Sequence, residues 1–282
     1  MDKRKSRKKK PESVQFLANC YFDSSSKVTV MPIFASTFLI WTLLLAGIES
    51  HTVPKGRIVG GENAHIDQFP HQISLRYDNS HICGGSIITR NYIITAAHCL
   101  SGYVKVYYAA SLFSIRAGSN LLNSGGVIVS VAEVKTHPSY ANLRNDIALL
   151  RLATTLTLSN SIQIIPLATN EVPAGSSVVI SGWGRLRGGG PLPTQLQYNT
   201  LTALSTAECS RRIRNAPTSI LCLAHTSGNG ACQGDSGGPG VYNGHLVGIT
   251  NFVIGTCGTN APDGYAKINY FNTLLMRVYI FI

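Results

Sequence analysis

The sequence has few acidic residues and few of the bulkiest hydrophobic side chains. Its 282 residues include 13 Asp and Glu against 24 Lys and Arg, with two Trp and three Met. Only 13% of the residues are charged and 44% are hydrophobic. This balance excludes an intrinsically disordered chain, which needs low hydrophobicity and high charge. We expect a packed protein of one large all-β domain or two smaller ones.

The formal net charge of +11 does not indicate nucleic-acid binding. Residues 1–30 hold eight Lys and Arg against three acids, whereas the chain from Ile58 onward holds 14 basic and nine acidic residues. Arg211, Arg212 and Arg214 form the one basic cluster after Ile58, and so short a group is typical of a solvated surface. No nucleic-acid partner is predicted.

The chain has no pair of cysteines in the C-x-x-C spacing typical of compact zinc sites. Apart from Cys20, six cysteines remain, namely Cys83, Cys99, Cys209, Cys222, Cys232 and Cys257. An even set in an exported chain indicates disulfides, but spacing alone leaves fifteen connectivities open for six cysteines. We expect no metal and no cofactor.

An apolar run at residues 31–48 is uncharged and is followed by small and polar residues. Residues 31–50 are therefore predicted to be a signal peptide, which makes the protein secreted and extracellular. The basic residues 3–10 upstream leave a membrane anchor as the alternative. Met31 could begin a complete signal peptide, so residues 1–30 form a basic extension that the native protein would lack if synthesis starts there.

Short runs rich in Val, Ile, Tyr and Thr follow from Ile58 onward, separated by clusters of Gly, Pro, Asn and Ser. Examples are residues 71–75, 86–95, 127–134, 177–180 and 246–250. Many short strands with frequent turn signals predict an antiparallel sandwich or a pair of barrels.

Three short motifs carry candidate chemistry. His98 closes an apolar run in Thr95-Ala96-Ala97-His98-Cys99, and Asp146 begins the apolar run Asn145–Leu150. A carboxylate there is costly unless it is hydrogen-bonded or paired. Ser236 lies in Gly234-Asp235-Ser236-Gly237-Gly238-Pro239, where flanking glycines let a substrate approach the hydroxyl closely. Each motif alone could be merely structural.

Together, in the order His, Asp, Ser, these motifs resemble the trypsin and chymotrypsin family of serine proteases. The resemblance runs from Ile58-Val59-Gly60-Gly61 to about Asn269 and includes Cys83-Gly84-Gly85-Ser86 and Gly182-Trp183-Gly184. It implies two six-stranded antiparallel Greek-key barrels with a short C-terminal helix. The protease domain would span residues 58–282, with the barrel boundary near residues 165–175.

The resemblance implies a monomeric serine endopeptidase that hydrolyses protein or peptide substrates through an acyl-enzyme and is open to protein inhibitors. Ser236 would be the nucleophile, His98 the general base and Asp146 the group that orients His98. The N–H groups of Gly234 and Ser236 would form the oxyanion hole. A non-catalytic homologue is the alternative class, because Asn251 replaces a serine that supports the catalytic acid in the family.

The Arg57-Ile58 junction resembles the family's activation site. Residues 51–57 would be an activation propeptide that a trypsin-like protease removes by cutting after Arg57, and the new ammonium of Ile58 would pair with Asp235. His81 either holds Asp235 in the uncleaved form, as in relatives, or is an ordinary surface residue.

The resemblance also implies three disulfides, Cys83–Cys99, Cys209–Cys222 and Cys232–Cys257. The segment at the family's calcium loop, residues 118–133, has Glu133 as its one acid and so too few oxygen ligands for tight calcium binding.

The expected specificity pocket has Gly230 at its base, where trypsin-like members have an acid. Val253 stands where relatives usually have Gly and should narrow the entrance. Both features favour a chymotrypsin-like or elastase-like preference for apolar side chains. Asp263 also borders the pocket in the family, so trypsin-like specificity through Asp263 is the alternative.

Overall fold

The computed structural model describes residues 58–101, 108–142, 144–214 and 216–272. The predicted extension, signal peptide and propeptide, with Arg57, lie outside the described residues. Among the residues that the structure describes, no helix is long and apolar enough to cross a membrane.

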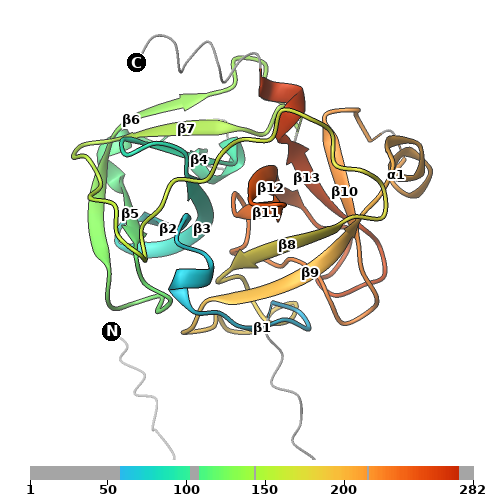
Figure 1. The fold of residues 1–282 in the computed structure, drawn as a ribbon, viewed down its shortest axis with the longest axis horizontal. Coiled ribbons are helices and arrows are strands. Elements are labelled where there is room, and N and C mark those ends of the chain that lie inside the picture. Colours follow the sequence, from blue (N-terminus) through green and yellow to red (C-terminus); the bar gives the residue numbers. More distant parts are fainter. Residues whose placement is uncertain (1–57, 102–107, 143, 215, 273–282) are drawn as a thin grey trace, which may run out of the picture. The chain divides into compact units, whose positions relative to one another are not determined.

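The first half of the described chain forms a closed antiparallel barrel (Figure 1). Its strands pair in the ring order β2-β3-β4-β7-β6-β5. They are β2 (Gln72–Tyr77), β3 (Ser80–Ile87), β4 (Tyr92–Thr95), β5 (Phe113–Ala117), β6 (Val127–Thr136) and β7 (Ala148–Leu152). Ile73 and Leu75 of β2 are fully buried, as the period of two along a strand requires for the inner face.

The second half forms another six-stranded ring, in which β8 pairs with both β9 and β11. Its strands are β8 (Ser177–Gly182), β9 (Gln197–Ala203), β10 (Ile220–Ala224), β11 (Pro239–Tyr242), β12 (His245–Phe252) and β13 (Asp263–Lys267). The short β1 (Glu62–Asn63) adds to β9. In each ring, three strands follow one another in chain order and the next three in reverse chain order. The predicted pair of six-stranded barrels is confirmed.

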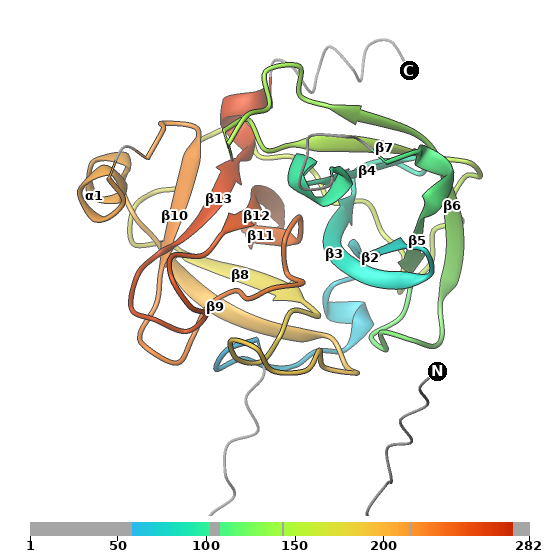
Figure 2. The ribbon, with the colours of Figure 1, turned by 180° about the vertical axis from the view of Figure 1, so that it is seen from behind.

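Short helical segments connect and cover the barrels. The 3₁₀ turns are η1 (Ile66–Gln68), η2 (Ala97–Leu100) and η3 (Ala110–Leu112). Helix α1 (Thr206–Arg212) begins at Ser205, whose side chain accepts the Glu208 N–H, and it lies at the edge of the second barrel beside β10 (Figure 2). Residues 268–272 are helical, as expected for the C-terminal helix.

The two barrels share buried surface. Ile165 packs into the core of the first barrel and Ala168 into that of the second, so the chain passes from one core to the other at the start of the expected boundary range. Ile268 and Phe271 of the C-terminal helix are buried against the first-barrel core. This shared packing fixes the position of the barrels relative to each other, which a site built between them requires.

Tight turns set the register of two hairpins. Asp78 and Asn79, between β2 and β3, both have positive φ angles, of 44° and 63°. Asn243 and Gly244, between β11 and β12, have φ angles of 48° and 74°. Two consecutive residues with positive φ are the mark of the hairpin turns that match strand twist, and Asn, Asp and Gly adopt them most readily.

The three disulfides that the resemblance implied are present. They join Cys83 to Cys99, Cys209 to Cys222 and Cys232 to Cys257. The first connects β3 to η2, the second holds α1 against β10, and the third joins the segments on either side of β11 and β12. The even cysteine set is therefore used for cross-links between elements.

Burial predicts the effect of core truncation on stability. Ile93 in β4 is fully buried, so Ile93→Ala should lower the free energy of unfolding by roughly 2–5 kcal/mol through lost burial and a residual cavity. The matched control is Ile128→Ala in β6, where the side chain is 51% exposed and the cost should be below about 1 kcal/mol. Urea unfolding of both variants measures the difference, and equal losses would contradict the described packing.

Candidate active site

The edge where β4 ends and β7 begins brings His98 and Asp146 together. Thr95 and Ala148 are register partners on these antiparallel strands, so the chain after Thr95 and the chain before Ala148 emerge at the same edge. The fully buried Asp146 accepts the His98 backbone N–H at 2.8 Å and lies 2.6 Å from the ring Nδ1. Both of these contacts to the carboxylate thus come from His98, in the segment that follows β4.

This contact determines what the imidazole of His98 can do. The carboxylate of Asp146 can only accept, so Nδ1 carries the proton and, in the neutral ring, Nε2 keeps its lone pair. The His98 side chain is 25% exposed, while that of Asp146 has no exposed surface. The ring is therefore held from its buried side and can accept a proton on its open side.

The loop that contains Ser236 is held against the same edge. The Ser236 carbonyl accepts the Gly84 N–H at 2.7 Å, and Gly237 donates to the Thr250 carbonyl at 2.7 Å. Gly237 has a φ of 76°, and a Cβ there would lie 2.2 Å from Oγ1 of Thr95. The loop of the half-buried Ser236 is therefore hydrogen-bonded to β3 and β12, and Gly237 lies against Thr95 at the end of β4, the strand that leads to His98.

Asp235 supports this loop from inside. Its carboxylate is 2% exposed and accepts the backbone N–H groups of Gly184 at 2.7 Å and Cys232 at 2.9 Å. A Cβ at Gly182 or Gly184 would lie 2.2 Å from the carboxylate, so both glycines of the Gly-Trp-Gly motif make room for it. Burial raises the pKa of Asp235 to about 7, against the two backbone hydrogen bonds, which favour its charged form.

The segment that begins at Ile58 lies in the second barrel. Ile58 is fully buried in the core that contains Val178, Ile180 and Ala231. Asn199 donates to the Val59 carbonyl at 3.3 Å, and a Cβ at Gly60 would collide with the side chain of Asn229. The predicted new terminus thus lies inside the domain.

His81 does not contact Asp235 in this structure. Its Nε2 donates to the carbonyl of Gly234 at 3.1 Å, and its Nδ1 lies 2.8 Å from Oγ of Ser74. Burial lowers the pKa of His81 to about 4, so the ring is neutral. His81 is thus a half-buried residue with partners on both ring nitrogens, and it supports Gly234, whose φ of 102° suits glycine alone.

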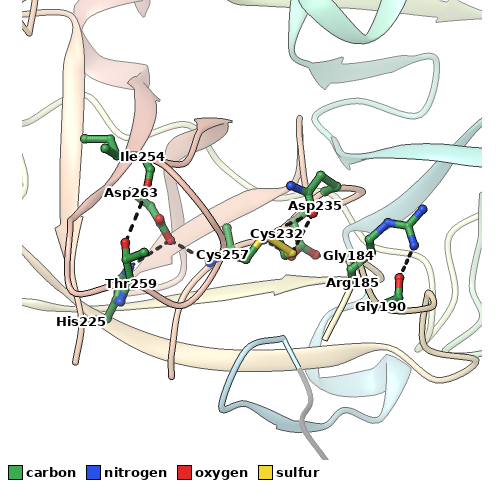
Figure 3. The surroundings of a disulfide bond; sticks show 12 residues. Gly184, Arg185, Gly190, His225, Cys232, Asp235, Ile254, Cys257, Thr259 and Asp263 are labelled. Atoms are coloured by element: carbon green, nitrogen blue, oxygen red, sulfur yellow. Dashed lines mark hydrogen bonds and ion pairs between the residues drawn. A yellow bond between two sulfur atoms is a disulfide. The ribbon is translucent and has the colours of Figure 1, made fainter. Parts of the chain in front are cut away.

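The structure brings Gly230 and Asp263 together and adds a residue that the sequence reasoning missed. A Cβ at Gly230 would lie 2.7 Å from Oδ2 of Asp263 and 2.6 Å from Nε2 of His225. Val253 packs against the second-barrel core that includes Ala231. Figure 3 shows Asp263 and His225 on one side of the Cys232–Cys257 disulfide and Asp235 on the other.

Comparison with known proteins agrees with this arrangement. The family model described as Trypsin matches residues 58–275. The chain belongs to the trypsin family.

Two of the similar relatives are insect proteins. The chain is 45% identical over 217 residues to "Serine protease SP24D" of Anopheles gambiae, covering 77% of this chain and 79% of that protein. It is 44% identical to "Trypsin alpha" of Drosophila melanogaster, covering 76% and 84%. The solved structure of neuropsin, a serine protease of mouse brain, matches with a TM-score of 0.71 and 29% identity, covering 78% and 98%. As a member of the trypsin family, this chain is a serine endopeptidase.

The segment at the family's calcium loop already holds a cation of the protein. The guanidinium of Arg116 donates to the carbonyls of Gly125 and Asn123. Glu133, the acid of this segment, pairs with Arg151 at 3.0 Å and with Lys135 at 3.4 Å. Two carbonyl oxygens of this segment and the Glu133 carboxylate are thus already in contact with arginine and lysine side chains.

Gly237 tests the link between the serine loop and the β4 edge. Gly237→Ala should lower kcat/KM at least tenfold, because the new methyl group would collide with Thr95 and displace Ser236 relative to His98. Gly244→Ala is the matched control: its φ of 74° carries a similar backbone strain of about 1 kcal/mol, but no atom lies within 4 Å. Steady-state hydrolysis and thermal unfolding of both variants separate the two effects. Similar kcat/KM values would show that the contact does not position the loop.

Proposed function

We propose that this protein is a secreted serine endopeptidase in which Ser236 attacks the scissile carbonyl and His98 accepts its proton. The observation that carries the proposal is the hydrogen bonding of His98 to the buried Asp146, with the Ser236 loop bound to β3 and packed against Thr95 at the end of β4. These contacts hold a base of fixed tautomer and the loop of the proposed nucleophile at one edge of the first barrel. Acyl transfer then requires the side chains of Ser236, His98 and Asp146 alone.

The reaction follows from these roles. Ser236 Oγ bonds to the carbonyl carbon as its proton passes to Nε2 of His98, and the carbonyl becomes an oxyanion. The Nδ1–H bond to Asp146 stabilises the imidazolium that forms. His98 then protonates the leaving amine, which yields the acyl-enzyme and the first product. Water then attacks the acyl carbon as His98 takes its proton, and His98 returns that proton to Ser236 Oγ as the ester bond breaks and the acid product leaves.

The N–H groups of Gly234 and Ser236 are the proposed donors to the oxyanion. Support for this comes from the strict shape of their loop. Gly234 has a φ of 102°, its carbonyl is held by His81, and Asp235 accepts the Cys232 N–H within the same turn. A fixed donor at this point is typically worth about 3 kcal/mol in the barrier.

Activation after Arg57 is also proposed. Asp235 is buried with a pKa raised to about 7, so its charged form gains from a cation beside it. Ile58, buried in the same half of the molecule, would present the ammonium that a cut after Arg57 creates. Pairing raises the pKa of the ammonium, and its contribution is therefore present at neutral pH and lost as the pH rises through that raised value.

The proposed substrates are proteins and peptides with an apolar side chain before the cut, at and below neutral pH. Support comes from Gly230, which places no acid of its own at the pocket base, and from Asp263, which already accepts the Ala231 N–H at 2.7 Å and faces His225 at 3.3 Å. A carboxylate with partners offers less to an incoming cation. Because some relatives are named trypsin, a preference for substrates with basic side chains before the cut, bound by Asp263, is the competing proposal.

Replacing the nucleophile tests the reaction. Ser236→Ala should abolish labelling by an organophosphorus serine reagent and lower kcat by a factor on the order of 10⁶, because the attacking oxygen is gone. Ser210→Ala, at an exposed position of α1, is the control and should react like wild type. Mass spectrometry of the labelled protein and peptide hydrolysis measure both effects. Cleavage at the wild-type rate by Ser236→Ala would exclude this mechanism.

Activation is tested on the protein that begins before Arg57. It should hydrolyse peptides at least 100-fold more slowly than the same protein after trypsin treatment, because the Ile58 ammonium forms only on cleavage. N-terminal sequencing of the active species should read Ile58-Val59-Gly60-Gly61. Arg57→Gln should remain inactive after the same treatment. Full activity of either uncut form would refute the activation step.

A further inference from the structure

His225 and Asp263 form a buried pair of side chains beside the pocket base. His225 follows β10 and Asp263 begins β13, and the register pair Leu223 and Asp263 brings these strand ends together. Nε2 of His225 lies 3.3 Å from Oδ2 of Asp263, with side-chain exposures of 3% and 5%. Little of either side chain is therefore exposed. In such surroundings a charge on one group interacts more strongly with nearby charges than it would in water.

Both ring nitrogens of His225 face acceptors. Nε2 faces the Asp263 carboxylate, and Nδ1 lies 3.2 Å from the carbonyl oxygen of Thr226. A neutral imidazole can donate from one nitrogen alone, so one of these contacts would set a lone pair against an oxygen. The imidazolium donates from Nδ1 to the Thr226 carbonyl and places its second N–H at ion-pair distance from the Asp263 carboxylate. The geometry around His225 thus suits its protonated form.

This pair occupies the space next to Gly230. A Cβ at Gly230 would approach both Nε2 of His225 and Oδ2 of Asp263 within 3 Å, and its φ of 112° also excludes other residues. At the proposed pocket base, the imidazole and the carboxylate therefore occupy the space that a side chain of residue 230 would fill.

We propose that His225 is a specificity-determining residue, which admits apolar or basic substrate side chains according to whether it is protonated and paired with Asp263. This inference rests on the proposed function of the pocket. When His225 is charged, the pair is neutral overall, and a substrate guanidinium would meet a like charge. When His225 is neutral, Asp263 is the one charge of the pair and can accept the substrate cation in its place.

Of the charged groups around His225, Asp263 favours the protonated state and Arg212 opposes it. Burial lowers the pKa of His225 and nearby Arg212 adds to this, but the contact with Asp263 outweighs both and leaves the pKa above its ordinary value. On the far side of Asp263 lie Asp235, proposed to pair with Ile58, and the Tyr265 hydroxyl, which stays neutral because burial raises its pKa well above 10. Once Asp235 is paired with the Ile58 ammonium, the charge of this group that changes near neutral pH is that of His225.

A second opening gives protons a route to His225. A surface cavity of about 470 Å³ is lined by Thr200, Thr202, Arg212, Ala224, His225, Thr226 and Asn229. His225 therefore lies between this cavity and the pocket base. Its protonation can follow the pH of the solution even while a substrate side chain fills the pocket.

The test compares two peptides that differ only in Arg or Leu before the cut, on the activated wild-type enzyme from pH 6 to pH 9. The ratio of their kcat/KM values cancels the ionisation of His98 and of the Ile58 ammonium, which act on both peptides alike. The Arg-to-Leu ratio should rise at least tenfold with pH, in a step of one proton, as His225 loses its charge. A flat ratio in wild type would overturn the proposal.

Variants assign the step to His225. His225→Gln should give a high ratio that does not change with pH, because Asp263 lacks its cation at every pH. Asp263→Asn should give a low, flat ratio. His245→Gln is the matched control, since its exposed ring also contacts a backbone carbonyl, at 2.9 Å from Asn243, and it should keep the wild-type profile. A wild-type profile in His225→Gln would overturn the proposal.

Binding without turnover separates this inference from the proposed reaction. Calorimetry should show that benzamidine, an aromatic cation that stays charged from pH 6 to pH 9, binds the cleaved Ser236→Ala protein at least tenfold more tightly at pH 9 than at pH 6. This result would support the role of His225 even if Ser236 were not the nucleophile. Equal affinity at both pH values would refute it, whatever the peptides show.

Discussion

The hydrogen bonds from His98 to the buried carboxylate of Asp146 are the interaction on which the rest of the structure depends. A carboxylate with no exposed surface is costly unless its oxygens accept hydrogen bonds, and His98 supplies one from its backbone and one from its ring. The strand register, the Cys83–Cys99 disulfide and the shared core between the barrels all hold these two residues in contact. The fold thus fixes the tautomer of the base before any substrate arrives.

Two more buried carboxylates, those of Asp235 and Asp263, have different partners in the second barrel. Asp235 accepts backbone N–H groups and is proposed to gain the Ile58 ammonium, so its charge is tied to activation. Asp263 accepts one backbone N–H and faces His225, and its charge is proposed to act in specificity. Both lie beside the Cys232–Cys257 disulfide (Figure 3), which holds these neighbouring acids in separate surroundings. Burial makes each carboxylate depend on a specific cation.

Much of the fold and of the candidate site could be predicted from the sequence, but the role proposed for His225 could not. Short apolar runs with Asn, Asp and Gly turns predict strands because both signals are local. His98, Asp146 and Ser236 could be proposed as a triad because their three motifs, in that order, resemble those of a known family. His225 lies in no such motif, and its meaning depends on the register of β10 against β13, which brings it to Asp263. Contacts of that kind arise from strand pairing and are not encoded in a short stretch of residues.

Asp146→Asn in the activated enzyme tests the central claim most directly. The amide keeps the size of the side chain, but it can present an N–H to Nδ1 of His98, which turns the ring to the wrong tautomer. The account predicts a folded protein whose kcat near neutral pH is lower than that of wild type by a factor on the order of 10⁴. A folded Asp146→Asn enzyme with kcat within tenfold of wild type would contradict it.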